Sequence, residues 1–142
     1  MTKQEFVSMS LPCGLKVLIP ESDNKYCRKT VIGTVGAVFD DGSINCFDTV
    51  NACPRWYKPV LYRLTDIVKF NLTVVDHYLS CSTIVCMETG CIGLTDISAY
   101  ELQFLVGNHF DIAGLIDKGQ AIDVNSLDVN PYSGRVNTYK KK

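Results

Sequence analysis

Residues 30–47 have the sequence TVIGTVGAVFDDGSINCF, in which two apolar runs flank the dipeptide Asp41-Gly42. This dipeptide favours a two-residue β-hairpin loop, because both of its residues accept positive φ angles. Gly33 and Gly36 interrupt the first run, and glycine inside a strand indicates a bulge, a bend or the close approach of another backbone. The stretch therefore predicts an antiparallel hairpin in a strongly coiled sheet or small barrel.

Three further segments predict strands. The segment GLKVLIP (residues 14–20) is a short apolar run closed by a proline. In residues 66–76 apolar and polar side chains alternate, as is typical of a half-buried antiparallel strand. Residues 78–88, followed by Thr89-Gly90, have the pattern of a second hairpin. We expect a mostly β fold, with α+β as the alternative: an antiparallel sheet or small barrel with one or two short helices.

The main helix is predicted at about residues 98–106. Ser98 and Glu101 have the spacing of a capping box, in which each side chain accepts a hydrogen bond from the other residue's backbone N–H. Gly107 stands where a left-handed residue would end the helix. Apolar side chains cover much of its circumference, so we expect it to pack against the sheet.

Residues 110–124 allow two interpretations. In the first, Asp111 caps a single turn that ends near Gly119. In the second, two strands flank the dipeptide Lys118-Gly119. The pattern of side chains is compatible with both.

The chain of 142 residues corresponds to one domain. We predict a compact β-rich domain at residues 1–130 and a polar basic tail at residues 131–142. Residues 71–134 carry eight acids and one base, which argues against a nucleic-acid footprint spread over the domain. The tail bases that could act as an electrostatic arm are Arg135, Lys140, Lys141 and Lys142.

The first residues of the chain lack the apolar run of a signal peptide. No apolar run approaches the ~18 residues that a membrane-spanning helix needs. We expect an intracellular, cytoplasmic protein with no membrane span. In a reducing compartment, its seven cysteines favour buried thiols or a metal site over disulfides.

The stretch HYLSCSTIVCMETGC (residues 77–91) carries one histidine and three cysteines. If it is a strand, His77 and Cys81 lie on one face, while Cys86 and Cys91 lie on the other. The four side chains then cannot converge on one tetrahedral ion. We therefore predict no metal and no cofactor, and we expect Cys81 in the core. Cys86 and Cys91 remain as candidate ligands only if the stretch is not a strand.

Two short segments resemble motifs of known proteins. IVCME (residues 84–88) resembles the LxCxE-type peptide that binds pocket proteins, but such a peptide must be accessible and extended rather than part of a sheet. AGLIDKG (residues 113–119) resembles the Asp-containing motif of dUTPases, a family that also has small β-rich chains. The family's tyrosine is missing after Asp117, and no upstream partner motif is present. Neither resemblance assigns a role to a residue of this chain.

The segment CPRWYKP (residues 53–59) is the predicted binding site. Its residues Arg55, Trp56, Tyr57 and Lys58 are of types that form interface hot spots or contact phosphates, and the flanking prolines make it rigid. In a nucleic-acid site, Trp56 or Tyr57 would stack on a base with Arg55 and Lys58 near phosphates. In the structural alternative, Trp56 plugs the open end of the sheet.

Neither a nucleophile elbow nor a phosphate-binding loop is present in the sequence. We therefore expect a non-enzymatic protein that acts through contacts with another protein or with itself. One alternative is a single-stranded nucleic-acid-binding module that uses the aromatic-basic loop and the basic tail. The other is a Cys/His hydrolase centred on His109, with Asp111 nearby. In overall character the chain is similar to compact viral accessory or structural proteins.

Overall fold

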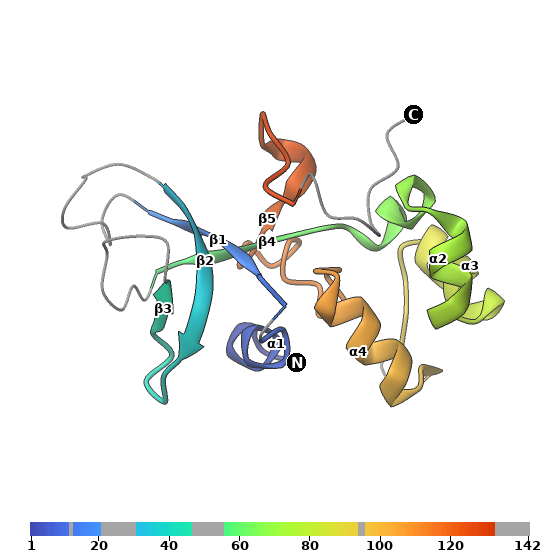
Figure 1. The fold of residues 1–142 in the computed structure, drawn as a ribbon, viewed down its shortest axis with the longest axis horizontal. Coiled ribbons are helices and arrows are strands. Elements are labelled where there is room, and N and C mark those ends of the chain that lie inside the picture. Colours follow the sequence, from blue (N-terminus) through green and yellow to red (C-terminus); the bar gives the residue numbers. More distant parts are fainter. Residues whose placement is uncertain (12, 21–30, 47–55, 94–95, 133–142) are drawn as a thin grey trace.

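The computed structural model describes residues 1–11, 13–20, 31–46, 56–93 and 96–132. Within these ranges the chain forms a mixed five-stranded sheet with several short helices, which is an α+β fold rather than a mostly β one (Figure 1). The helices are α1 (Lys3–Met9), α2 (Leu72–Tyr78), α3 (Cys81–Glu88), α4 (Ala99–Gly107) and the 3₁₀ helices η2 (Leu64–Lys69) and η4 (Val124–Ser126). The strands are β1 (Lys16–Ile19), β2 (Val31–Val38), β3 (Ile44–Cys46), β4 (Lys58–Leu61) and β5 (Ile122–Asp123).

The sheet has the strand order β3-β2-β1-β4-β5, and it is not a closed barrel. All neighbouring strands are antiparallel except β4 and β5, which are parallel. The predicted hairpin is confirmed as β2–β3, but its loop spans residues 39–43 instead of two residues. Gly42 has the expected positive φ of 87°. The register shifts between Val35 and Ala37, so the irregularity expected from the strand glycines lies at Gly36.

Strand β4 lies partly within the segment CPRWYKP, which was interpreted as a surface loop or a sheet edge. Pro59 is opposite Val17 of β1, whereas β5 pairs only with Val60 and Leu61. A proline has no N–H to donate to a neighbouring strand, so it is tolerated where one side of the strand has no partner. The proline thus marks the beginning of a strand and not a loop.

Helix α1 was not predicted, although its signal is local. Thr2 and Glu5 form a capping box, with the Glu5 N–H donating to Thr2 Oγ1 and the Thr2 N–H donating to Glu5 Oε1, each at 3.1 Å. The helix buries Phe6 and Val7. It contacts β2 and α4, so it connects the sheet to the helices (Figure 1).

Residues 66–76 were predicted as a strand, and this prediction is wrong. They form the end of η2 and most of α2. The Asn71 side chain caps α2 by accepting a hydrogen bond from the Thr73 N–H at 3.0 Å. The helix buries Val75, and Leu79 four residues later is buried as well, whereas Val68 is exposed. Alternation over a few residues therefore concealed a helical periodicity.

Residues 78–88 were also predicted as a strand, but residues 81–88 form helix α3, with Ser80 as its N-cap. Gly90 has a φ of 81°, which is the left-handed conformation that ends a helix and not the turn of a hairpin. Cys81 is exposed at the first turn and is not a core residue. The segment IVCME is helical, so it does not form an extended peptide in this fold.

Helix α4 confirms the predicted main helix and the capping box of Ser98 and Glu101. The left-handed conformation predicted for Gly107 is wrong. Gly107 is the last helical residue, and His109 adopts the left-handed conformation with a φ of 69°. A Cβ at position 107 would lie 3.3 Å from Cys13 Sγ, a tight contact that a larger residue could make only if this thiol shifted by a few tenths of an ångström.

Tyr132 connects the sheet to the end of helix α4. Its hydroxyl donates to the Val60 carbonyl at 2.7 Å and accepts from the Lys16 N–H at 2.9 Å, which links β4 to β1. Its ring stacks on His109 at the end of α4, with the centroids 4.2 Å apart. Tyr132 is therefore part of the core, and the division into domain and tail stays a prediction. The helices of the described ranges are all too short or too polar to span a membrane.

Candidate functional site

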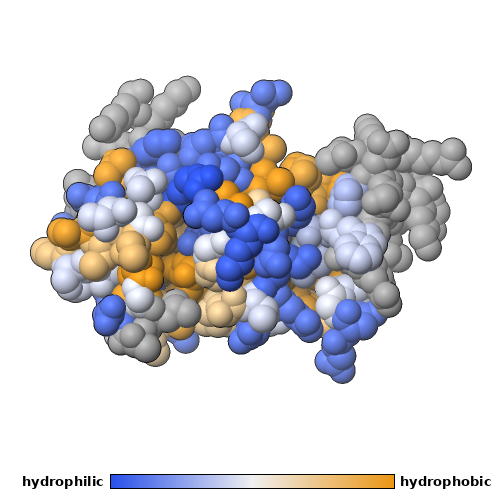
Figure 2. All heavy atoms as spheres, turned by 180° about the vertical axis from the view of Figure 1, so that it is seen from behind, coloured by the Kyte–Doolittle hydropathy of each residue, from blue (hydrophilic) through white to orange (hydrophobic). Residues whose placement is uncertain are grey.

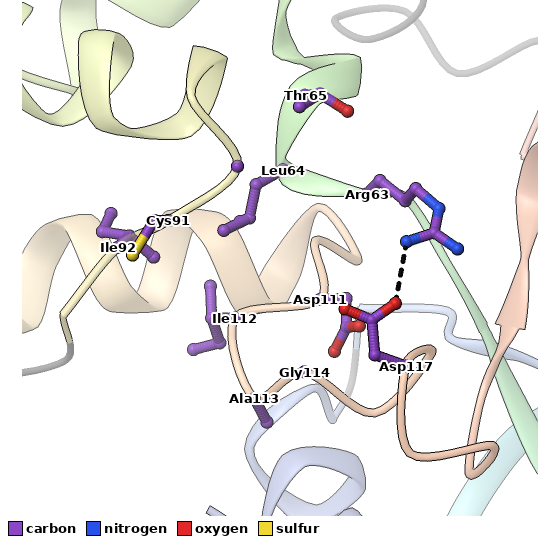
Figure 3. Close-up of a pocket in the computed structure, with 11 residues that line it drawn as sticks. Arg63, Leu64, Thr65, Cys91, Ile92, Asp111, Ile112, Ala113, Gly114 and Asp117 are labelled. Atoms are coloured by element: carbon purple, nitrogen blue, oxygen red, sulfur yellow. Dashed lines mark hydrogen bonds and ion pairs between the residues drawn. The ribbon is translucent and has the colours of Figure 1, made fainter.

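A cavity of about 330 Å³ opens beyond the carboxyl end of β4 (Figure 3). Three segments that are distant in the sequence line it: the residues after β4, the end of α3 and the segment after α4. The lining residues are Arg63, Leu64, Thr65, Gly90, Cys91, Ile92, Asp111, Ile112, Ala113, Gly114 and Asp117.

The cavity forms where two parallel segments separate. The Tyr62 N–H donates to the His109 carbonyl, and the Asp111 N–H donates to the Tyr62 carbonyl, both at 2.8 Å. Tyr62 and Phe110 thereby form a parallel bridge. Beyond this bridge, Arg63 continues into η2 while the chain after Asp111 turns away, so the two backbones diverge and leave space between them.

Arg63 carries the positive charge at this site. Its Nη1 lies 3.1 Å from Asp117 Oδ1 (Figure 3). Its Nε lies 2.7 Å from Asp123 Oδ2. The hydrogen bond to Asp123, followed by that to Asp117, raises the pKa of Arg63. Since two carboxylates already neutralise the guanidinium, an anionic ligand would have to compete with them.

Asp111 organises the wall of the cavity. Its carboxylate oxygens accept hydrogen bonds from the Leu115 N–H at 2.7 Å and the Ile116 N–H at 2.9 Å. The turn that follows ends at Gly119, which has a φ of 73°. The first interpretation of residues 110–124 is therefore confirmed, and that of two strands around Lys118-Gly119 is wrong. Both carboxylate oxygens of Asp111 accept hydrogen bonds from this turn, so we assign Asp111 a structural role.

The residues that line the cavity include a thiol, Cys91, but no histidine. His109 is only 1% exposed and stacks on Tyr132. His77 lies on the exposed surface of α2. The cavity therefore does not bring a cysteine and a histidine together, as the hydrolase hypothesis would require, and that hypothesis gains no support from this site.

A second candidate site is an exposed stack of aromatic rings between α2 and α4. Tyr78 stacks on Phe104 with the ring centroids 4.7 Å apart, and on Tyr100 at 5.9 Å. Tyr100 is 57% exposed and Tyr78 is 38% exposed. We call Tyr78, Tyr100 and Phe104 the aromatic stack.

The helices that carry the aromatic stack belong to an acidic stretch of the sequence. Residues 71–117, which include α2, α3 and α4, contain six acids and no lysine or arginine. Asp76, Glu88 and Asp96 are exposed. Val68 of η2 and Val85 of α3 are exposed hydrophobic residues. Figure 2 shows orange, hydrophobic atoms at its left, which is the side of α2 and α3 in this view.

Glu101 joins α4 to α3 beneath this surface. Its Oε2 accepts hydrogen bonds from the Ser80 N–H at 3.0 Å and from the Thr83 hydroxyl at 2.7 Å. Partial burial raises the pKa of Glu101, but the hydrogen bonds from Ser80, Thr83 and Ser98 outweigh burial and leave the pKa below its ordinary value. The Glu101 carboxylate therefore stays ionised while it positions the two helices.

The described residues of the predicted binding loop differ in their exposure to solvent. Trp56 is 70% exposed and Lys58 is exposed, but Tyr57 is buried, with only 1% of its surface exposed. Burial, followed by the nearby Cys46, raises the pKa of Tyr57 to about 12. Lys3 Nζ lies 4.2 Å from the centroid of the Tyr57 ring and donates to the Tyr57 carbonyl at 3.0 Å. Tyr57 is thus not accessible to a base or a partner.

The remaining predicted residues lie apart from this loop or outside the described ranges. Arg55 and the tail bases Arg135, Lys140, Lys141 and Lys142 are outside the described residues. Cys86 and Cys91 are exposed. In the part of the chain that the structure describes, no three His, Cys, Asp or Glu side chains converge as a set of metal ligands.

The sequence interpretation did not single out Arg63, Tyr78 or Tyr100. The spacing of four residues between Tyr100 and Phe104 was a usable signal, because such residues are neighbours on a helix. Arg63 had no such signal, since its partners lie more than fifty residues away along the chain.

In comparisons with known proteins, no family model matches the chain, and no match is found among curated proteins or among solved structures. The geometry of the described residues therefore carries the functional argument.

Proposed function

We propose that this protein acts by binding a basic segment of another polypeptide on the aromatic stack. The observation that carries the proposal is a stack of three rings, of which Tyr78 and Tyr100 are exposed, on helices that contain acids but no lysine or arginine. Tyrosine is enriched at interface hot spots, because its ring supplies a large contact area at a low entropic cost. The face of a tyrosine ring also attracts the guanidinium of arginine and the ammonium of lysine.

The C-terminal segment of the chain itself has the composition of such a ligand. Residues 135–142 contain one arginine, three lysines and no acid. A second copy could therefore place its tail on the aromatic stack of the first. Self-association through the tail is the form of the proposal that we test first, because it requires no further partner.

The test is the oligomeric state of the full chain, measured by sedimentation or light scattering over a range of protein and salt concentrations. We expect assembly at low salt that weakens as salt screens the charges. The double variant Tyr78→Ala/Tyr100→Ala should weaken assembly by roughly thirtyfold, as for loss of a hot spot. Replacing Lys140, Lys141 and Lys142 by glutamine should weaken it as well.

Trp56→Ala is the matched control, because it removes an exposed aromatic residue at the other end of the sheet. The strand that follows it, β4, begins at the end of the molecule opposite α2 and α3 (Figure 1). If Trp56→Ala abolishes assembly and the tyrosine variant does not, the interface is the loop and the proposal is wrong.

A second measurement keeps the proposal testable if the chain is monomeric. A synthetic peptide of residues 133–142 is titrated into the protein and its binding is followed by calorimetry. A protein that remains monomeric and also fails to bind this peptide at low salt would overturn the proposal. The nucleic-acid and hydrolase hypotheses stay predictions; salt-dependent binding of single-stranded RNA that is lost in Trp56→Ala would favour the former.

A further inference from the structure

The end of α3 brings two exposed cysteines together. The Gly90 N–H donates to the Met87 carbonyl at 2.9 Å, and the Cys91 N–H donates to the Cys86 carbonyl at 3.2 Å. These two hydrogen bonds, with Gly90 in the left-handed conformation, define a Schellman motif. In this motif the side chains at the positions of Cys86 and Cys91 commonly contact each other.

The backbone geometry places the Cα atoms of the two cysteines near the distance that a disulfide spans. Standard bond lengths and the hydrogen bond of 3.2 Å place the Cα atoms of Cys86 and Cys91 at most about 7 Å apart. The bent geometry of a hydrogen bond brings them closer than this limit. Disulfides join residues whose Cα atoms are about 4.4–6.8 Å apart. The Thr89 hydroxyl also donates to the Cys86 carbonyl at 2.7 Å, which holds this end of the helix in place.

We propose that Cys86 and Cys91 form a dithiol site that reacts with small-molecule disulfides and closes to an intrachain disulfide. Both thiols are exposed, so a reagent can reach them. This inference concerns the end of α3 and does not depend on the proposed contact at the aromatic stack.

The reaction consists of two thiol–disulfide exchanges. The thiolate of one cysteine attacks a sulfur of the reagent, forms a mixed disulfide and releases one small thiolate. The thiolate of the second cysteine then attacks the protein sulfur of the mixed disulfide, which forms the Cys86–Cys91 bond and releases the second small thiolate. Two electrons pass from the protein sulfurs to the reagent, and the two thiol protons pass through solvent to the released thiolates.

Closure would affect the cavity, because Cys91 lines it together with Gly90 and Ile92. A bond to Cys86 would hold Cys91 against the last turn of α3. The redox state of the pair would thereby set the position of one wall of the cavity.

Cys81 provides a matched control on the same helix. It is exposed like the pair, but in an α-helix a separation of five residues corresponds to about 7.5 Å along the axis and about 140° around it. Cys81 therefore cannot close onto Cys86 without unwinding the helix. We expect Cys81 to form mixed disulfides that persist.

The experiment incubates the folded protein with a redox buffer of oxidised and reduced glutathione, followed by alkylation and peptide mapping by mass spectrometry. We expect a linked Cys86–Cys91 peptide in the wild type and in Cys81→Ser. In Cys86→Ser and in Cys91→Ser, the remaining cysteine should instead keep a mixed disulfide with glutathione. A persistent mixed disulfide on Cys86 or Cys91 of the folded wild type, with no linked peptide, would overturn the proposal.

A synthetic peptide of residues 84–93 separates the effect of the fold from simple proximity in sequence. We expect the equilibrium constant for closing the disulfide with glutathione to be roughly tenfold or more larger in the folded protein than in the peptide, because the helix end is preorganised. Equal equilibrium constants in the protein and the peptide would show that the Schellman motif does not favour closure of the disulfide. Circular dichroism of each serine variant checks that it is folded.

Discussion

The β2–β3 hairpin and the α2–α3 pair of helices are built from similar residues, yet they adopt different structures. Both segments are rich in valine, isoleucine and threonine. They differ at their ends. In the hairpin, Asp41 accepts hydrogen bonds from the Ser43 N–H and hydroxyl, and Gly42 has a positive φ. In the helices, Asn71 and Ser80 accept hydrogen bonds from backbone N–H groups of the first turn.

This difference shows that β-branched composition is a poor guide to structure when the segment is short. Isolated helices of seven or eight residues are unstable, so α2 and α3 depend on their caps and on packing. Val75, Leu79, Ile84 and Met87 become buried when these helices are in place. The hairpin instead depends on pairing with β1, and its turn determines the register.

The largest expected effect comes from removing the contacts of Tyr132, which connect β1 and β4 to His109 beyond the end of α4. Tyr132→Ala removes a buried ring and the hydroxyl that bridges β1 and β4, so we expect the free energy of unfolding to fall by about 4 kcal/mol. Tyr132→Phe keeps the ring and leaves the Lys16 N–H and the Val60 carbonyl without this hydroxyl, which should cost about 2 kcal/mol. Denaturant unfolding measures both values. An equal decrease in the free energy of unfolding in the two variants would show that the Tyr132 ring contributes nothing to stability.

A smaller effect is expected from removing the helix caps. Asn71→Ala and Ser80→Ala should each lower the free energy of unfolding by about 1 kcal/mol, because each leaves an N–H of the first turn without its acceptor. Asp41→Ala, in the hairpin loop, is the matched control in the other region. Circular dichroism should show a loss of helical signal in the cap variants only. A gain of strand signal in the variant that combines Asn71→Ala with Ser80→Ala would mean that the caps alone prevent residues 71–88 from forming strands.

The smallest effect is expected from two titrating groups, Glu101 in α4 and Tyr57 directly before β4. Glu101 has a lowered pKa in the folded protein, so its contribution to stability is present above its ordinary value of 4.5 and is lost as the pH falls through the folded pKa. Tyr57 has a pKa raised to about 12, so its contribution is present below the ordinary value of 10.0 and is lost as the pH rises toward 12.

The pH dependence of unfolding separates these groups. Glu101→Gln should flatten the acid side of the stability profile, and Tyr57→Phe should flatten the alkaline side. Unfolding midpoints of each variant are compared with those of the wild type across the pH range. An unchanged acid side in Glu101→Gln would show that the junction of α3 and α4 does not depend on this carboxylate.

Elements with a strong local signal were predictable. The hairpin has Asp41-Gly42, and α4 has the capping box of Ser98 and Glu101. Strand β4 was missed because its pairing depends on β1 and β5, the latter about sixty residues further along the chain. The cavity and the aromatic stack were missed for the same reason, since each joins residues of elements that are separated in the sequence.

The sequence alone determined where the chain turns and where charge accumulates. Caps, turn glycines and the absence of bases from residues 71–117 depend on residue type and spacing, which are properties of short segments. Tertiary structure decided that residues 72–78 and 81–88 are helical, that Tyr57 is buried while Trp56 is exposed, and that a backbone hydrogen bond joins Cys91 to Cys86 at a helix end. The α2–α3 helices and the burial of Tyr57 depend on packing between distant segments, which stabilises conformations that short segments do not hold in isolation.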